Sequence, residues 1–180
     1  MKEKIQFMIL VSTVFLVAST ARAQQPSTHT HDHHKQHSSK SDSQHHAEVN
    51  RRGDEAMGFR HEKTTHHFIL KPDGGLIDVA ANSAADTESR DQIRDHLKEI
   101  EKLFAEGDFT KPMHTHGKMP PGAEVMIRLR QEISYKYEET ELGGRVRATT
   151  RNADALRAIH EFLRFQITDH KTGDSLDIQK

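Results

Sequence analysis

The fold is decided by the stretch TTHHFILKPDGGLIDVA, residues 64–80. Its first half, 64–71, is rich in β-branched and aromatic residues, and 72–75 is a run of turn-forming residues. Residues 76–80 then return to a strand-forming composition. Together they predict a β-hairpin.

Downstream of this hairpin the hydrophobic pattern changes to that of a helix. Apolar residues recur every three or four positions from Ile93 to Phe104, which is the period of a helix buried on one face. We expect this helix to begin near Asp86 or Thr87 and to end at Gly107.

The second half of the chain follows the same plan. Residues 133–150 alternate around Gly143-Gly144, whose positive φ values would form a tight turn, and a last amphipathic helix starts at about Asn152. The sequence thus predicts an α+β fold. It would be a two-layer sandwich in which a ββα unit occurs twice, with one antiparallel sheet and two helices on one face. The open sheet face would be left for a protein or small-molecule partner.

The first 23 residues have the three parts of a secretory signal peptide. Lys2 and Lys4 give a positive start, residues 7–18 are apolar, and Ala21-Arg22-Ala23 is a cleavage sequence. The apolar run is shorter than the roughly 20 residues that a membrane-spanning helix needs, although an uncleaved anchor is the alternative. We predict cleavage after Ala23, a periplasmic or extracellular location, and no membrane attachment afterwards.

Residues 24–52 contain few side chains that could be buried. Ser, Gln, Lys and His dominate them, which predicts a disordered tail followed by a single α+β domain over residues 53–176. Closely spaced neutral imidazoles on a flexible chain bind Cu(II), Zn(II) and Ni(II), so the tail is a candidate metal collector; a solubilising linker is the alternative. Its histidines are His29, His31, His33, His34, His37, His45 and His46.

A second group of candidate metal ligands lies in residues 108–122, a segment rich in proline and glycine that we expect to be a loop. Thioether sulfur suits Cu(I), and imidazole suits both oxidation states of copper. The alternative is that the methionines pack at the edge of the core while the histidines are solvated. The four residues are Met113, His114, His116 and Met119.

His66 and His67 are neighbours in the first predicted strand, so their side chains point to opposite faces and only one can enter a given site. If this strand lies beside residues 113–119, that histidine could complete a three- or four-ligand site with His61 or Met57. A hydrogen-bonded histidine in the sheet is the alternative reading of each.

The helical histidines are not predicted to be ligands. His96 and His160 fall at the margins of apolar helix faces, which favours a half-buried position at the boundary of the core. His170 follows the last predicted helix, where a cation is mildly favourable.

Composition excludes several classes of protein. The chain has no cysteine, which excludes disulfides, thiolate metal sites and covalent c-type haem, and its formal net charge of −1 does not suit nucleic acid. No nucleophile elbow, zinc-protease helix or phosphate-binding loop is present, so an enzyme is not predicted. A small hydrolase or lyase that uses His66 or His67, and non-covalent haem held by His and Met, are the open alternatives.

Five phrases resemble a family of small exported bacterial proteins of unassigned function. The resemblance covers most of residues 51–175 and implies a single exported domain, but it implies no mechanism and does not include the tail. The phrases are RGDEAMGF at 52–59, THHF at 65–68, DGG at 73–75, GDF at 107–109 and IHEFLRFQI at 159–167.

These observations favour an exported metal-binding protein, with copper preferred and zinc or nickel as alternatives. The tail would collect metal weakly, and a Met/His site on the folded domain would bind it specifically. The main competing hypothesis is a non-enzymatic α+β binding or interaction module in which the histidines are incidental.

Overall fold

The computed structural model describes the backbone of residues 32–180 and the side chains of residues 41–180. The predicted signal peptide, His29 and His31 lie outside the described residues. Two short 3-10 turns, η1 and η2, accompany the helices and strands. In chain order the elements are α1 Asp32–Met57, η1 His61–Lys63, β1 Thr64–Lys71, β2 Gly74–Ala81, α2 Thr87–Glu106, α3 Thr110–His116, α4 Ala123–Arg128, η2 Arg130–Glu132, β3 Ile133–Thr140, β4 Gly143–Thr150 and α5 Ala153–His170.

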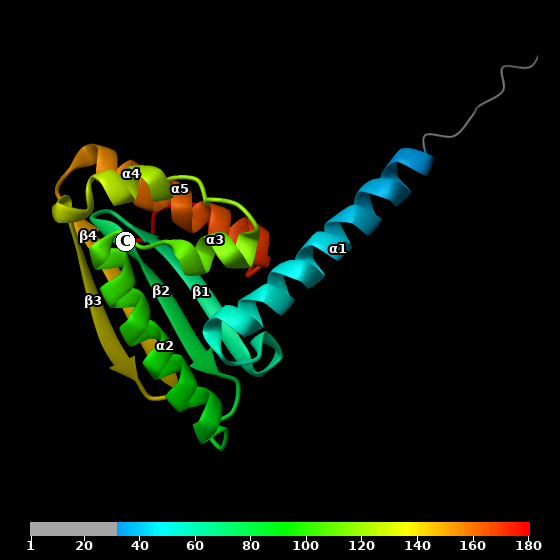
Figure 1. Ribbon diagram of the computed structural model, residues 1–180, viewed down its shortest axis with the longest axis horizontal. Coiled ribbons are helices and arrows are strands. Elements are labelled where there is room, and N and C mark those ends of the chain that lie inside the picture. The colour runs from blue at the N-terminus through cyan, green and yellow to red at the C-terminus, as the bar shows by residue number, and fades with distance from the viewer. Residues whose placement is uncertain (1–31) are drawn as a thin grey trace, which may run out of the picture.

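The strands form one antiparallel sheet in the order β1-β2-β4-β3 (Figure 1). Each hairpin is followed by a long helix, so the predicted α+β fold with two ββα units is confirmed. Inner-face residues of all four strands join α2 and α5 in a single hydrophobic core, as Phe68, Val146 and Ile133 illustrate. Both long helices therefore cover the same face of the sheet.

The predicted helix boundaries are also confirmed. Asp86 caps α2, because its side chain accepts a hydrogen bond from the Ser89 backbone N–H, and Gly107 ends it with φ of 83°. Asn152 caps α5 in the same way, accepting from the N–H groups of Asp154 and Ala155.

The prediction for Gly143-Gly144 was wrong. The turn of the second hairpin is formed by Glu141 and Leu142, and both glycines belong to β4. Their role is close packing: a Cβ atom on Gly143 would lie 2.2 Å from the carbonyl oxygen of Val79. Neighbouring backbones approach here because no side chain separates them.

Helix α1 replaces the tail predicted for the residues from Asp32 onward, and Figure 1 shows its first half projecting from the body. Its last turns belong to the domain. Val49 is fully buried, and the Arg52 guanidinium donates to the Thr115 carbonyl oxygen at 2.9 Å. The domain therefore begins several residues before the predicted start at Gly53, because a few anchors suffice to hold an otherwise polar helix.

The segment 108–122 also differs from the prediction of a loop. It contains helix α3 and the connection from α3 to α4. Pro112 lies in the first turn of α3, where a backbone N–H has no helical partner to lose. Gly117 ends the helix with φ of 67°.

The C-terminal residues run along the free edge of β1. The Asp174 carboxylate accepts from the Phe68 N–H at 2.9 Å, and the Gln179 N–H donates to the Leu70 carbonyl oxygen at 2.9 Å. The ordered chain thus extends beyond the predicted limit at residue 176. These contacts occupy backbone groups that an edge strand would otherwise expose.

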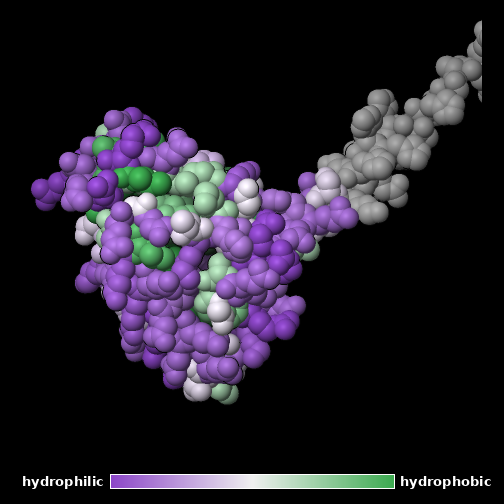
Figure 2. All heavy atoms as spheres, in the orientation of Figure 1, coloured by the Kyte–Doolittle hydropathy of each residue, from purple (hydrophilic) through white to green (hydrophobic). Residues whose placement is uncertain are grey.

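The surface seen in Figure 2 is largely hydrophilic, with apolar residues showing between α2 and the helices α3 and α4. Within residues 32–180, no helix combines the length and apolarity needed to cross a bilayer.

Candidate functional site

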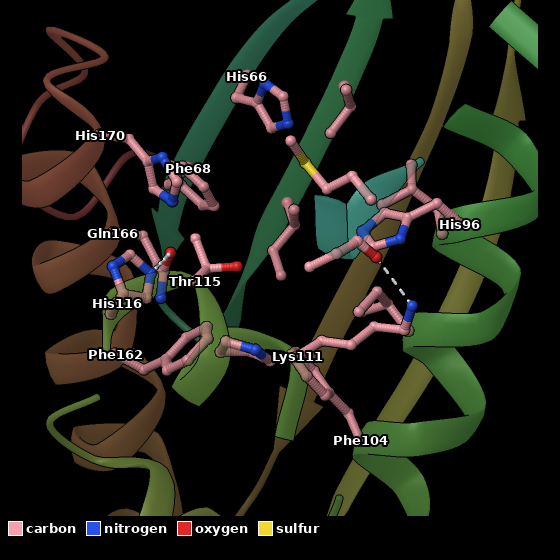
Figure 3. A pocket seen from close by; sticks show the side chains of 17 residues that line it. His66, Phe68, His96, Phe104, Lys111, Thr115, His116, Phe162, Gln166 and His170 are labelled. Carbon is pink, nitrogen blue, oxygen red and sulfur yellow. Dashed lines mark hydrogen bonds between the residues drawn. The ribbon is translucent and has the colours of Figure 1, made fainter. Parts of the chain in front are cut away.

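A cavity of about 80 Å³ lies between the inner face of the sheet, the helices α2, α3 and α5, and the last turn of α1. We call it the inner cavity, and Figure 3 shows its side chains converging from these elements. Strand alternation directs His66 and Phe68 into it, and the helical period directs His96, Ile100 and Phe104 into it. Most of its wall is apolar: Phe68, Ile77, Leu97, Ile100, Phe104 and Phe162.

Three histidines interrupt this apolar wall. His66 comes from β1, His96 from α2, and His170 is the last residue of α5. Burial lowers the pKa of His66 to about 4 and the pKa values of His96 and His170 to about 3, because an imidazolium would lose its hydration there. All three imidazoles are therefore uncharged at neutral pH.

These three rings are held by aromatic contacts. The Phe59 ring centroid lies 6.0 Å from that of His66 and 5.7 Å from that of His96, and Phe68 stacks on His170 at 5.7 Å. The Nδ1 atom of His96 is buried and has no hydrogen-bond partner among the described residues. Because a neutral imidazole carries one donor and one acceptor, the cavity has unused hydrogen-bonding capacity.

The polar end of the cavity is built around His116. Its Nδ1 lies 2.6 Å from an Asp169 carboxylate oxygen and its Nε2 lies 3.0 Å from the Gln166 side-chain oxygen. The Nε2 atom of Gln166 is buried without a partner in the part of the chain that the structure describes. Burial alone would raise the pKa of Asp169, but hydrogen bonds from His45 and His116 outweigh this and lower it.

Lys111 joins three helices beside the cavity. Its ammonium donates to the Ala56 carbonyl oxygen at 2.9 Å and pairs with the Glu99 carboxylate at 3.1 Å. The lysine therefore ties α3 to the end of α1 and to α2. Because the charge of Lys111 is already paired with Glu99, a ligand in the cavity does not need a negative charge to neutralise this lysine.

A second pocket of about 220 Å³ adjoins the first, and we call it the histidine pocket. It lies between α1, η1, the start of β1 and the end of α5, and it shares three side chains with the inner cavity: Met57, His66 and His170. His46 and His61 complete its histidines.

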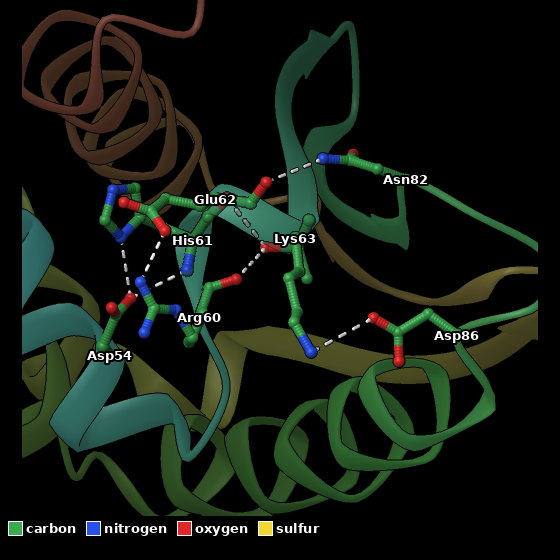
Figure 4. Close-up of polar contacts among 8 residues, drawn as sticks. Asp54, Arg60, His61, Glu62, Lys63, Asn82 and Asp86 are labelled. Carbon is green, nitrogen blue, oxygen red and sulfur yellow. Dashed lines mark hydrogen bonds and ion pairs between the residues drawn. The ribbon is translucent and has the colours of Figure 1, made fainter.

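His61 is fixed at the edge of this pocket by Asp54 (Figure 4). One Asp54 carboxylate oxygen accepts from the His61 backbone N–H at 2.8 Å and lies 2.9 Å from its Nδ1. The neighbouring Asn82 donates to the Glu62 carbonyl oxygen and so holds the same turn against the end of β2.

The ligands predicted in residues 113–119 do not converge. Helix α3 places His114 and His116 about 160° apart around its axis: His114 is exposed near Glu55, whereas His116 is buried. Met113 is 40% exposed, and Met119 packs against the core. The first strand does lie beside this segment, which the sequence left open, since His66 and His116 line one cavity.

The remaining predicted ligands are dispersed. His67 points to the outer face, opposite to His66 as predicted, and its Nδ1 lies 2.8 Å from the Asp174 carboxylate. His45 contacts Asp169 at 2.8 Å. His33, His34 and His37 lie in α1 before the residues whose side chains are described. Among the described residues, no three His, Asp or Glu side chains form a ready-made metal site.

Sequence reasoning missed four residues of the cavity: His96, Lys111, Gln166 and His170. A signal for two of them was present. Gln166 and His170 continue the three- and four-residue spacing of the apolar face of α5 beyond Leu163, so they had to face the core.

Comparison with protein-family models, curated proteins and solved structures finds no match.

Proposed function

We propose that this chain is a binding protein for a small uncharged molecule, which it holds in the inner cavity. The observation that carries the proposal is the presence of unpaired polar atoms in an apolar chamber. In keeping with the signal peptide predicted at residues 1–23, the protein would act outside the cytoplasm.

The unpaired atoms are a reason to expect a ligand. A buried polar group without a hydrogen bond costs about 1–3 kcal/mol, and native proteins retain few such groups. Two of them, His96 Nδ1 and Gln166 Nε2, belong to residues that line the inner cavity. A ligand that carries both a donor and an acceptor would recover this cost, whereas a purely apolar ligand would not.

Size and charge define the ligand further. An engineered cavity of roughly 150 Å³ accepts benzene, so a cavity of about 80 Å³ suits a molecule smaller than benzene, such as a five-membered ring or a short chain. The aromatic walls at Phe68, Phe104 and Phe162 favour a flat ring. The uncharged imidazoles favour a neutral one, because a buried charge would lack a counter-ion.

The test is a binding screen on the full chain in the presence of a metal chelator. Pyrazole, 1,2,4-triazole and acetamide serve as probes and cyclohexane carboxamide as an oversized control, observed by saturation-transfer NMR and by thermal shift. We expect the small, flat, neutral probes to bind and the oversized control not to bind. Replacing His96→Phe should weaken binding about tenfold, which corresponds to about 1.4 kcal/mol and to the loss of one hydrogen bond.

His67→Phe is the matched control. It makes the same change of side chain on the outer face of β1, away from the inner cavity, and should leave binding intact. The proposal fails if none of the flat probes binds, or if the two substitutions affect binding equally.

A further inference from the structure

We propose that two copies of this chain pair through the outer edge of β3 and join their four-stranded sheets into one continuous sheet. The inference does not depend on small-molecule binding, because the described lining of the inner cavity includes no residue of β3. It follows from the place of β3 in the sheet, from the charges on the strand and from the helix beside it.

The two edges of the sheet are covered differently. The edge of β1 is covered by the C-terminal segment, as the bond from the Phe68 N–H to Asp174 shows. Strand β3 is the terminal strand on the other side (Figure 1). There the Tyr137 N–H donates to the Glu101 carboxylate of α2 at 3.0 Å rather than to a neighbouring strand. An edge strand of eight residues is a template on which another strand can pair.

The bond to Glu101 shows which backbone groups of β3 face outward. In an antiparallel pair, the N–H and C=O groups of alternate residues point to the same side. Since those of Tyr137 point away from β4, those of Tyr135 and Glu139 do so as well. These residues would make the hydrogen bonds to a second strand. Because outward-facing residues must lie opposite one another, only every second register is possible.

The charges of β3 select one of these registers. Lys136 and Glu138 flank the core-facing Tyr137 and lie on the outer face, with 73% and 40% of their side chains exposed. When Tyr137 lies opposite Tyr137 of the second copy, each Lys136 lies opposite a Glu138. Either neighbouring register places Lys136 opposite Lys136 or Glu138 opposite Glu138. Opposite charges across strands stabilise pairing and like charges oppose it, so the two-fold register centred on Tyr137 is preferred.

The existing sheet extends this charge pattern. Glu138 lies opposite Arg145, whose Nε is 3.1 Å from the Asp78 carboxylate on the next strand. With Lys136 of the second copy added, the row would alternate in sign across four strands. Within its own sheet Lys136 lies opposite Arg147, a neighbour of like charge. A carboxylate from the second copy would offset that repulsion.

Helix α2 brings a second complementary pair to the same place. The Lys98 ammonium lies 5.6 Å from the centre of the Tyr137 ring, and the Glu101 carboxylate accepts from the Tyr137 N–H. Both side chains therefore lie beside the two-fold axis of a dimer centred on Tyr137. When this N–H donates to the second copy instead, Glu101 is released and can pair with Lys98 of that copy.

The test exchanges the two charges of β3. Sedimentation velocity of the full chain from about 1 μM to about 1 mM measures dimerisation. Lys136→Glu and Glu138→Lys should each weaken the dimer by about tenfold, because each places like charges opposite one another at two symmetric positions. The double variant should recover the affinity of the parent to within about threefold, since the two charges have only exchanged places.

Lys71→Glu is the matched control, because it reverses a charge in β1 at the other side of the sheet and should leave dimerisation unchanged. Circular dichroism checks that each variant is folded. Lys136→Glu should fold, because it places a carboxylate opposite Arg147. Hydrogen exchange measured by NMR locates the interface: the amides of Tyr135 and Glu139 should exchange more slowly as the concentration of the chain rises.

Three results would overturn the proposal: a chain that stays monomeric throughout this range, a dimer indifferent to Lys136→Glu, or a double variant that associates as weakly as the single ones. A dimer that leaves the amides of Tyr135 and Glu139 unprotected would use another surface and would also contradict it. The binding screen on the inner cavity is a separate measurement, so either proposal can fail without the other.

Discussion

At His66, His96 and His170 the protein keeps imidazoles uncharged by surrounding them with aromatic and aliphatic side chains. The same burial that makes these rings useful to a ligand also makes them costly to protonate. A histidine whose pKa is lowered on folding binds protons more readily in the unfolded chain. Its contribution to the free energy of unfolding is therefore complete above pH 6.5 and is lost as the pH falls from 6.5 toward the pKa of the folded state.

This linkage predicts acid sensitivity. With folded pKa values of about 4, 3 and 3, each of these histidines should cost about 2 kcal/mol of unfolding free energy when the pH falls from 8 to 5. Urea unfolding at both pH values measures this loss. His96→Phe should recover about 2 kcal/mol of it, whereas His114→Ala should recover none. Equal losses in all three proteins would contradict the prediction.

Among the strands and helices, the contact between β2 and α5 depends on Gly75. A Cβ atom there would lie 2.2 Å from Leu163 Cδ1 and 2.8 Å from the Ile69 carbonyl oxygen. Gly53 in α1 is the opposite case, since its nearest neighbours would be Met57 Cε at 3.5 Å and Thr115 Cγ2 at 3.6 Å, which is ordinary contact.

We therefore expect Gly75→Ala to destabilise the fold by about 1–3 kcal/mol through overpacking. Gly53→Ala should leave stability unchanged or raise it by up to about 1 kcal/mol, because alanine is the better helix former. Chemical unfolding of the two variants provides the measurement. A Gly75→Ala protein as stable as the parent would show that α5 can move away from β2 without cost.

The same elements show how far prediction from sequence extends. Both hairpins and the helices α2 and α5 could be predicted, because the hydrophobic period and the capping residues of each lie in a local stretch such as residues 64–80 or 86–107. Helix α1 and helix α3 could not. Their composition is polar or rich in breakers, and what holds them is tertiary: the burial of Val49 and the bond from Arg52 to Thr115.

At the scale of the whole molecule, the two pockets combine segments that are far apart in the chain. His66, His96 and His170 line one cavity only because the sheet order places α5 over β1 and β2 and places α2 over β2, β4 and β3. No local pattern encodes that meeting. The His/Met spacing in residues 113–119 was misleading for the same reason, since the helix formed there separates His114 from His116.

The C-terminal segment provides a prediction at this scale. Removing residues 173–180 would free the Phe68 N–H and the Leu70 carbonyl oxygen on the edge of β1. Exposed strand edges pair with one another, so the truncated chain should self-associate more than the intact one as its concentration rises. Sedimentation velocity measures this. Gln179→Ala is the control, because it keeps the backbone bond; identical sedimentation of truncated and intact chains would refute the prediction.

Lys111 has a consequence for rates rather than for affinity. Because it bonds α3 to the carbonyl of Ala56 and to Glu99, moving α3 away from α1 or α2 would break one of these contacts. A ligand that left the inner cavity by this route would be slowed by them. Its residence time would then depend in part on Lys111, which is one of the residues that line the cavity.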